Sequence, residues 1–177
     1  MNKRKKEFKK QKLLFCAKIT YPWMSSHVFC WKRGVTDSKK KELFLDNSDY
    51  FVDTFVPNIE KAKNQETFNR LLFEGITHIQ ESYESYQSNC FFTKYAKWVN
   101  SFLKMAFLTN SISLKEKYLH CPIDETVLNI LGDNKTKWSK ADFNQYNSII
   151  KKINDTKKHQ TIFRWELEQW NNPKIGG

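Results

Sequence analysis

The sequence predicts a mainly α fold, with six to eight helices packed into a single compact domain. Beyond residue 36, apolar residues recur at three- and four-residue intervals, which is the period of a helix with one buried face. Apolar residues make up 40% of the chain and aromatic residues 15%, a composition that excludes wholesale disorder. At 177 residues, the chain is long enough to bury one substantial core.

The N-terminal region departs from this helical pattern. Residues 1–12 carry seven basic side chains and one acid, and we expect them to form a basic disordered tail. The single domain is then expected to span residues 13–177. Its first apolar run, within residues 12–20, fits a strand or a helix, and Tyr21-Pro22-Trp23 breaks it. The expected start of the domain is therefore a short irregular or β-containing segment.

Cap and periodicity signals predict the helices that follow. Thr36 is suited to cap a helix reaching Phe44, and Ser48 could start another, which Pro57 stops or kinks. Residues 65–87 form the longest periodic segment, in which Gly75 marks either close packing or a bend.

Residues 93–132 contain the helix around which we expect the other elements to be arranged. Its surface is almost entirely apolar, and its polar residues form one narrow stripe, consisting of Lys97, Asn100, Ser101 and Lys104. An apolar helix of this kind is expected to be central, so its polar stripe is expected to face a cleft. After a loop, Asp124 is placed to cap a short helix that Gly132 closes.

Two more helices are expected after residue 132. Residues 139–142 resemble a capping box, and the helix after them carries an apolar stripe that includes Tyr146. A last helix is expected from about Thr161 until Asn171-Asn172-Pro173 stops it.

The net charge of +11 points towards a polyanionic partner. Six of these charges lie in residues 1–12, which could be a solvated arm or an arm that contacts phosphates. No apolar run approaches the roughly 18 residues of a membrane span, and no signal-peptide pattern is present. We therefore expect a cytoplasmic protein without a membrane partner.

Common metal and cofactor motifs are absent from the sequence. The four cysteines include no C-x-x-C pair, and no glycine-rich phosphate loop, G-x-S-x-G elbow or H-E-x-x-H motif occurs. We expect reduced thiols, no metal and no cofactor. The remaining candidate is Lys97 with Asp124, as an amine nucleophile and its carboxylate partner. The structural alternative is a lysine on a polar stripe and an ordinary helix cap.

The same residues resemble the helix-hairpin-helix DNA glycosylases of the 8-oxoguanine type, including their compact archaeal branch. That family has a lysine on one helix, then a loop, then P-[VI]-D at the opening of the next helix. Here Lys97-Trp98-Val99-Asn100 and Lys104-Met105 precede Pro122-Ile123-Asp124. The resemblance covers about residues 90–132, and Cys90-Phe91-Phe92 stands where the family has hairpin glycines.

This resemblance implies a base-excision N-glycosylase and lyase acting on a modified purine in DNA. Lys97 would be the nucleophile, with Lys94 as the alternative, and Asp124 the carboxylate. DNA would be the partner, with RNA or a nucleotide as alternatives. Relatives of this type in bacterial antiviral operons also imply a role in antiviral defence. The expected substrate-binding residues are Trp98, Asn100, Lys104 and His120.

A rival hypothesis is a non-catalytic, basic helical protein that binds nucleic acid or a nucleic-acid enzyme. It predicts an affinity that falls steeply with salt and depends on residues 1–12 rather than on Asp124. Convergence of Lys97 and Asp124 in a concave pocket would favour the enzyme, whereas positions on separate solvent-facing sides would exclude it.

Overall fold

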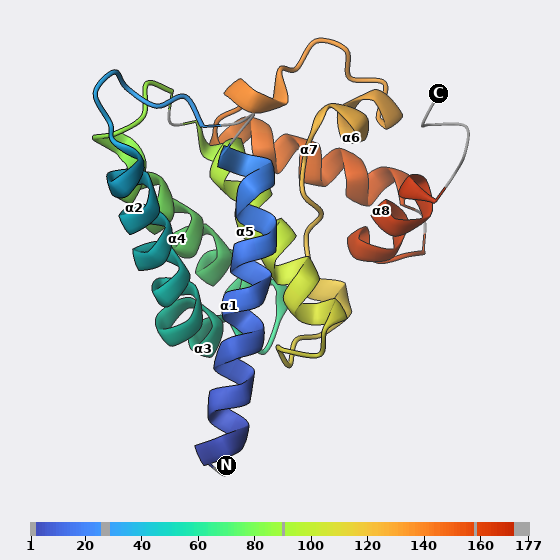
Figure 1. Ribbon diagram of the computed structural model, residues 1–177. Helices are drawn as coiled ribbons and strands as arrows, with labels where there is room; N and C mark the ends of the chain where they lie inside the picture. Colours follow the sequence, from blue (N-terminus) through green and yellow to red (C-terminus); the bar gives the residue numbers. More distant parts are fainter. Residues whose placement is uncertain (1–2, 26–28, 90, 158, 172–177) are drawn as a thin grey trace.

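The chain forms helices along nearly all of the part that the structure describes. The computed structural model describes residues 3–25, 29–89, 91–157 and 159–171 (Figure 1). The predicted mainly α class is confirmed. The helical elements are α1 (Lys3–Ser25), α2 (Asp37–Tyr50), the π-helical turn η1 (Phe51–Phe55), α3 (Val56–Ile59), α4 (Gln65–Glu84), α5 (Phe92–Leu108), the 3₁₀ turn η2 (Glu116–Tyr118), α6 (Glu125–Ile130), the 3₁₀ turn η3 (Trp138–Lys140), α7 (Phe143–Thr156) and α8 (Ile162–Trp170).

Helix α5 is the central element, as its apolar sequence predicted. It contacts α1, α4, α7 and η3. In Figure 1, α2, α3 and α4 lie on one side of it, α6, α7 and α8 lie on the other, and α1 crosses in front. The polar stripe of α5 is therefore within reach of the C-terminal elements.

Side-chain caps explain where several of these helices begin. Thr36, Asp124 and Thr161 each accept a hydrogen bond from a backbone N–H three residues further on, which confirms the three predicted starts. The capping box of α7 lies three residues later than predicted. It joins Asp142 to Gln145, because the side chain of each accepts from the other's backbone N–H.

The predicted disorder of residues 1–12 is wrong for the described part of that segment. Helix α1 begins at Lys3 and continues without a break past residue 12. Two lysines attach it to distant parts of the chain: Lys9 pairs with Glu60 at 2.8 Å, and Lys10 pairs with Asp53 at 3.0 Å. These partners are more than 40 residues away in sequence, so charge composition alone could not reveal them.

The predicted irregular or β-containing N-terminal segment is also wrong over residues 13–25, which are helical. The β-like pairing in the described residues is an isolated bridge between Trp31 and Gln87. It is supported by two backbone hydrogen bonds, from Lys32 N–H to the Tyr86 carbonyl and from Ser88 N–H to the Cys30 carbonyl. One bridge does not make a strand, so the described residues form a mainly α fold without a sheet.

The expected new helix start at Ser48 is absent. The Ser48 hydroxyl instead donates to the Phe44 carbonyl one turn earlier, and α2 continues into the π-helical turn η1 and then α3. Pro57 lies in the first turn of α3. A proline lacks the N–H that a helix interior requires, and the wider turn before it lets the chain keep its helical course.

The core is rich in aromatic side chains and tightly packed around α5. The largest fully buried side chains include Trp98, Tyr95 and Phe102 from α5 itself. Gly75 marks close packing, because a Cβ atom at this position would lie 2.3 Å from the Phe55 ring. Within the described residues, no helix is both long and apolar enough to cross a membrane.

Candidate functional site

The polar stripe of α5 faces the C-terminal part of the chain, and its side chains find partners there. Lys97 contacts Asp124, Asn100 contacts Tyr146, and Lys104 contacts Glu166. These contacts follow one another along one face of α5, since residues three or four apart on a helix are neighbours.

Asp124 reaches this face at the end of an extended segment that crosses the interior. Residues 119–123 are all buried and lie between the η2 turn and α6. Asp124 then caps α6, where its Oδ1 accepts the Val127 N–H at 3.2 Å. The cap fixes the orientation of the carboxylate, so Oδ2 is directed towards α5.

Lys97 and Asp124 converge, which meets one part of the enzyme hypothesis, the other part being a concave pocket around them. The Lys97 Nζ lies 3.2 Å from Asp124 Oδ2, and the two side chains remain 17% and 16% exposed. They are therefore mostly removed from water, with a small part of each side chain at the surface.

Trp138 completes the surroundings of Lys97. The ammonium lies 4.7 Å from the centroid of the Trp138 ring, within the range of a cation–π contact. The first turn of α5 holds η3 in place, because the buried Thr93 hydroxyl donates to the carbonyl oxygens of Trp138 and Ala141. The amine is thus bounded by a carboxylate and an aromatic ring.

Lys94, the alternative nucleophile, occupies a different environment. It is 5% exposed, and its Nζ lies 3.8 Å from Cys30 Sγ. Asp124 pairs with Lys97 instead. The geometry therefore places Lys97, and not Lys94, beside the carboxylate.

Trp98 lies in the core rather than at the Lys97 site. Its side chain is fully buried and contacts the rings of Tyr21, Phe29 and Phe51, among others. A ring enclosed in this way supports α5 but has no exposed face on which a base could stack.

Asn100 and His120, two predicted substrate-binding residues, are joined through Tyr146. Asn100 Nδ2 donates to the Tyr146 hydroxyl at 3.0 Å, and that hydroxyl lies 2.9 Å from His120 Nδ1. The direction of the contact between Tyr146 and His120 depends on the tautomer of the imidazole: with the proton on Nε2, His120 Nδ1 accepts from the Tyr146 hydroxyl.

Burial supports the neutral form of this histidine. His120 is 4% exposed, and desolvation lowers its pKa to about 4. Burial also raises the pKa of the Tyr146 hydroxyl. His120 in addition lines a pocket of about 310 Å³ between α4, the end of α7 and the start of α8.

Lys104 is engaged in a close ion pair, although its side chain, at 19% exposed, is about as accessible as that of Lys97. Its Nζ lies 2.6 and 2.7 Å from the two carboxylate oxygens of Glu166 on α8, and the Glu166 side chain is 4% exposed. The pair attaches α8 to α5. The neighbouring Cys121 is buried, and desolvation, followed by the charges of Glu166 and Asp124, raises the pKa of its thiol.

Three residues that complete these contacts were not among the predicted site residues: Trp138, Tyr146 and Glu166. Trp138 could have been singled out from the sequence, since it is the one aromatic residue in the polar stretch 133–142 before α7. Tyr146 was assigned to an apolar stripe, which conceals its hydroxyl contacts. Glu166 lies in a helix of mixed composition and carries no local signal.

Metal binding has no support in the described residues, where no cluster of three or more His, Cys, Asp or Glu side chains could hold an ion. Comparison with protein-family models, curated proteins and solved structures finds no match. The fold and site therefore define the protein only as a mainly α domain with a partly buried lysine–carboxylate pair on its central helix.

Proposed function

We propose that this protein is a base-excision N-glycosylase and lyase that acts on a modified purine in DNA. The observation that carries the proposal is the 3.2 Å contact between Lys97 Nζ and Asp124 Oδ2. Support also comes from the resemblance of residues 90–132 to 8-oxoguanine-type glycosylases, in which a helix lysine and the aspartate of P-[VI]-D share the site.

The first step requires a neutral amine. In the resting pair, Lys97 is an ammonium held by Asp124, so its proton must leave before it can attack. Asp124 is close enough to take this proton and relay it to solvent. The Lys97 Nζ then forms a bond to the sugar C1′, the bond from C1′ to the purine nitrogen breaks, and its electron pair leaves with the base. The departing base takes up a proton.

Asp124 has a second role in this step. Cleavage of the glycosidic bond builds positive charge at C1′, and a fixed carboxylate beside it stabilises that charge. The cap to Val127 N–H holds the carboxylate in place beforehand. Trp138 limits access of water to one side of the amine.

The lyase step follows from the covalent intermediate. The ring oxygen O4′ leaves C1′ and takes a proton, which gives a protonated Schiff base between C1′ and Lys97. Loss of a C2′ proton then drives elimination of the 3′ phosphate through cleavage of the C3′–O3′ bond. Borohydride delivers hydride to the Schiff base and makes the link between protein and DNA permanent.

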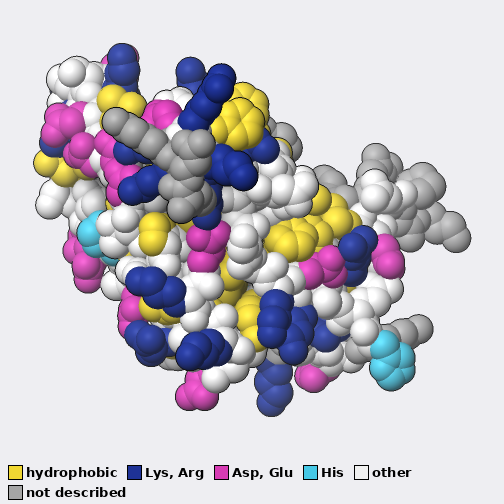
Figure 2. Space-filling view, turned by 90° about the horizontal axis from the view of Figure 1, so that it is seen from below, with side chains coloured by type: hydrophobic (Ala, Val, Ile, Leu, Met, Phe, Trp, Pro, Cys, Tyr) yellow, Lys and Arg dark blue, Asp and Glu magenta, His cyan; other side chains and the backbone are white. Residues whose placement is uncertain are grey.

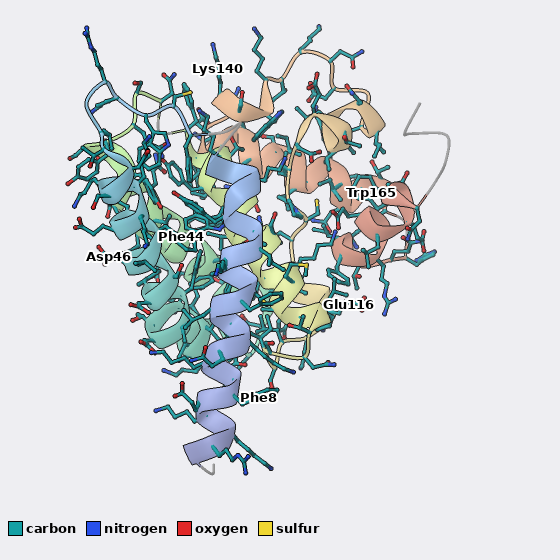
Figure 3. The ribbon with its side chains drawn as sticks, viewed as in Figure 1. Phe8, Phe44, Asp46, Glu116, Lys140 and Trp165 are labelled. Atoms are coloured by element: carbon teal, nitrogen blue, oxygen red, sulfur yellow. The ribbon has the colours of Figure 1, made fainter. Side chains whose placement is uncertain are left out.

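Borohydride trapping tests the proposal directly. Duplex and single-stranded oligonucleotides carrying 8-oxoguanine or an abasic site are incubated with the protein and borohydride, and the covalent adduct is measured. Lys97→Gln should reduce the adduct at least 100-fold while DNA binding stays within about threefold, because the lost group is the nucleophile rather than a phosphate contact. Lys140→Gln is the matched control, since Lys140 is an exposed lysine in η3 two residues from Trp138 (Figure 3).

Two outcomes would contradict the proposal. An adduct that persists in Lys97→Gln and disappears in Lys94→Gln would assign the chemistry to the other lysine. No adduct with the unmodified protein, together with tight salt-sensitive binding, would favour the rival hypothesis of a non-catalytic protein that binds nucleic acid or a nucleic-acid enzyme.

A further inference from the structure

Helix α1 carries the two most exposed large apolar side chains in the described part of the chain. Phe8 is 64% exposed and Phe15 is 59% exposed. They are seven residues apart, so they lie on the same face of the helix, two turns from each other and about 10 Å apart along its axis. Large exposed aromatic rings on one face indicate an interaction surface.

Cations alternate with these rings along that face. At 100° per residue, Lys5, Phe8, Lys12 and Phe15 fall within an arc of about 80°, and no acid lies in it. We call these four residues the aromatic–basic stripe. The Lys12 ammonium lies 4.9 Å from the Phe8 ring centroid, and its bond to the Thr109 carbonyl, at 3.4 Å, leaves further N–H donors.

The rest of α1 holds the stripe outwards. Leu13, Cys16 and Ala17 are buried against the body of the protein. Lys9 and Lys10 pair with Glu60 and Asp53. The stripe is therefore held on a helix that is anchored along one neighbouring face, so little conformational freedom is lost when a ligand binds.

The first turns of α1 extend past the neighbouring helices (Figure 1), and Phe8 projects from this end (Figure 3). Seen from below, several Lys and Arg side chains gather around this end, with hydrophobic side chains beside them and Asp or Glu side chains on one side (Figure 2). The surface is thus convex, basic and aromatic.

We propose that the aromatic–basic stripe binds a single strand of nucleic acid. Unpaired bases stack on Phe8 and Phe15, and the phosphates between them contact Lys5 and Lys12. The alternation of aromatic rings and cations indicates which kind of partner the stripe binds. A helix that enters a membrane surface keeps its cations outside the apolar stripe, whereas here they lie within it. A second copy of the stripe would be repelled by like charge, and the bases of a duplex are not accessible to the rings. The inference does not depend on the chemistry of Lys97.

Fluorescence titration with a labelled 20-nucleotide thymidine strand tests the proposal. Phe8→Ala and Phe15→Ala should each weaken binding about tenfold, because each removes one stacked base. Phe143→Ala is the matched control, since Phe143 is an exposed aromatic residue on α7, and it should change the affinity less than twofold. Both α1 substitutions remove exposed side chains, so the thermal unfolding midpoint should not change.

The charges are tested separately. Lys5→Ser with Lys12→Ser should reduce the slope of log affinity against log salt by about 1.4, which corresponds to two phosphate contacts on a single strand. Lys135→Ser with Lys137→Ser, in the exposed loop before η3, should leave the slope unchanged.

Three results would overturn the inference: unchanged affinity in Phe8→Ala and Phe15→Ala together, tighter binding to a duplex of equal length, or preferential binding to phosphatidylserine vesicles. Lys97→Gln is expected to bind the strand as tightly as the unmodified protein. Failure of the proposed enzyme activity would therefore be seen in trapping, and failure of this inference would be seen in strand binding.

Discussion

The lysines of two ion pairs lie seven residues apart on the same face of α5. The two pairs differ in geometry and burial, and this difference distinguishes a candidate reactive group from a structural one. Lys104 contacts both carboxylate oxygens of Glu166 at 2.6 and 2.7 Å, and the carboxylate is almost fully buried. Lys97 makes one contact with Asp124 at 3.2 Å, and both side chains keep about a sixth of their surface exposed.

This difference teaches that pairing by itself does not identify a reactive lysine. A bidentate contact with a buried carboxylate satisfies the ammonium and fixes it, and it connects α8 to the central helix. A single contact at a partly exposed position, next to an aromatic ring, can be exchanged for a ligand. This distinction predicts that the Lys104–Glu166 pair matters mainly for stability and the Lys97–Asp124 pair mainly for chemistry.

The largest expected effect on stability is at the buried pair. Glu166→Gln should lower the free energy of unfolding by about 3 kcal/mol, because it leaves the Lys104 charge mostly buried without a carboxylate. Urea unfolding at pH 7.5 measures this, with Glu42→Gln, in the exposed pair with Lys39, as the control expected to cost less than about 0.5 kcal/mol. If Asp124→Asn lowers the free energy of unfolding as much as Glu166→Gln does, the two pairs are structurally equivalent and the distinction between them is wrong.

A pH effect of intermediate size should come from His120, which lies between the two pairs. Its pKa is lowered from 6.5 to about 4 in the folded protein, so the unfolded chain binds the proton first as the pH falls. Stability from this group is complete above pH 6.5 and is lost as the pH drops towards 4.

Between pH 7.5 and 5.0, the expected loss from His120 is about 2 kcal/mol. Urea unfolding at the two pH values measures it, and His120→Asn, which keeps an acceptor for Tyr146, should remove this part of the pH dependence. An unchanged dependence in the variant would mean that other groups titrate, and that His120 is not held in the neutral form.

The smallest expected effect on stability comes from a substitution that keeps the helix-capping function of Asp124 and removes its carboxylate. Serine also caps helices well, so Asp124→Ser should keep α6 capped and change the free energy of unfolding by less than about 1 kcal/mol. It removes the carboxylate beside Lys97, and on the proposed function it should reduce borohydride trapping at least tenfold. A stable variant that traps DNA as well as the unmodified protein would leave Asp124 with a structural role alone.

Local signals in the sequence were sufficient for much of the fold. The caps at Thr36, Asp124 and Thr161 and the glycine after α6 depend on residues within one helical turn, so they could be recognised without knowledge of the tertiary structure. The central position of α5 followed from its nearly uninterrupted apolar surface.

Long-range contacts account for what the sequence did not reveal. The lysines of α1 suggest a disordered arm until Glu60 and Asp53 are seen to hold two of them. Pro22 suggests a break, yet α1 continues to Ser25. At the site, the pairing of Lys97 with Asp124 was predicted, but the contacts of Trp138, Tyr146 and Glu166 join residues 41 to 62 positions apart and have no local pattern.

The extended segment 119–123 acts as a spacer of fixed length between the η2 turn and Asp124. The Tyr118 carbonyl is anchored by the Gln65 side chain at one end, and the cap of α6 fixes the other. An insertion or deletion of one residue would move Asp124 by about 3.3 Å and turn the next side chain to the opposite side. A shift of this size would break the 3.2 Å contact between Asp124 and Lys97. Insertions and deletions should therefore be tolerated in the loop 134–137 but not in this buried segment, even where every hydrophobic residue is kept.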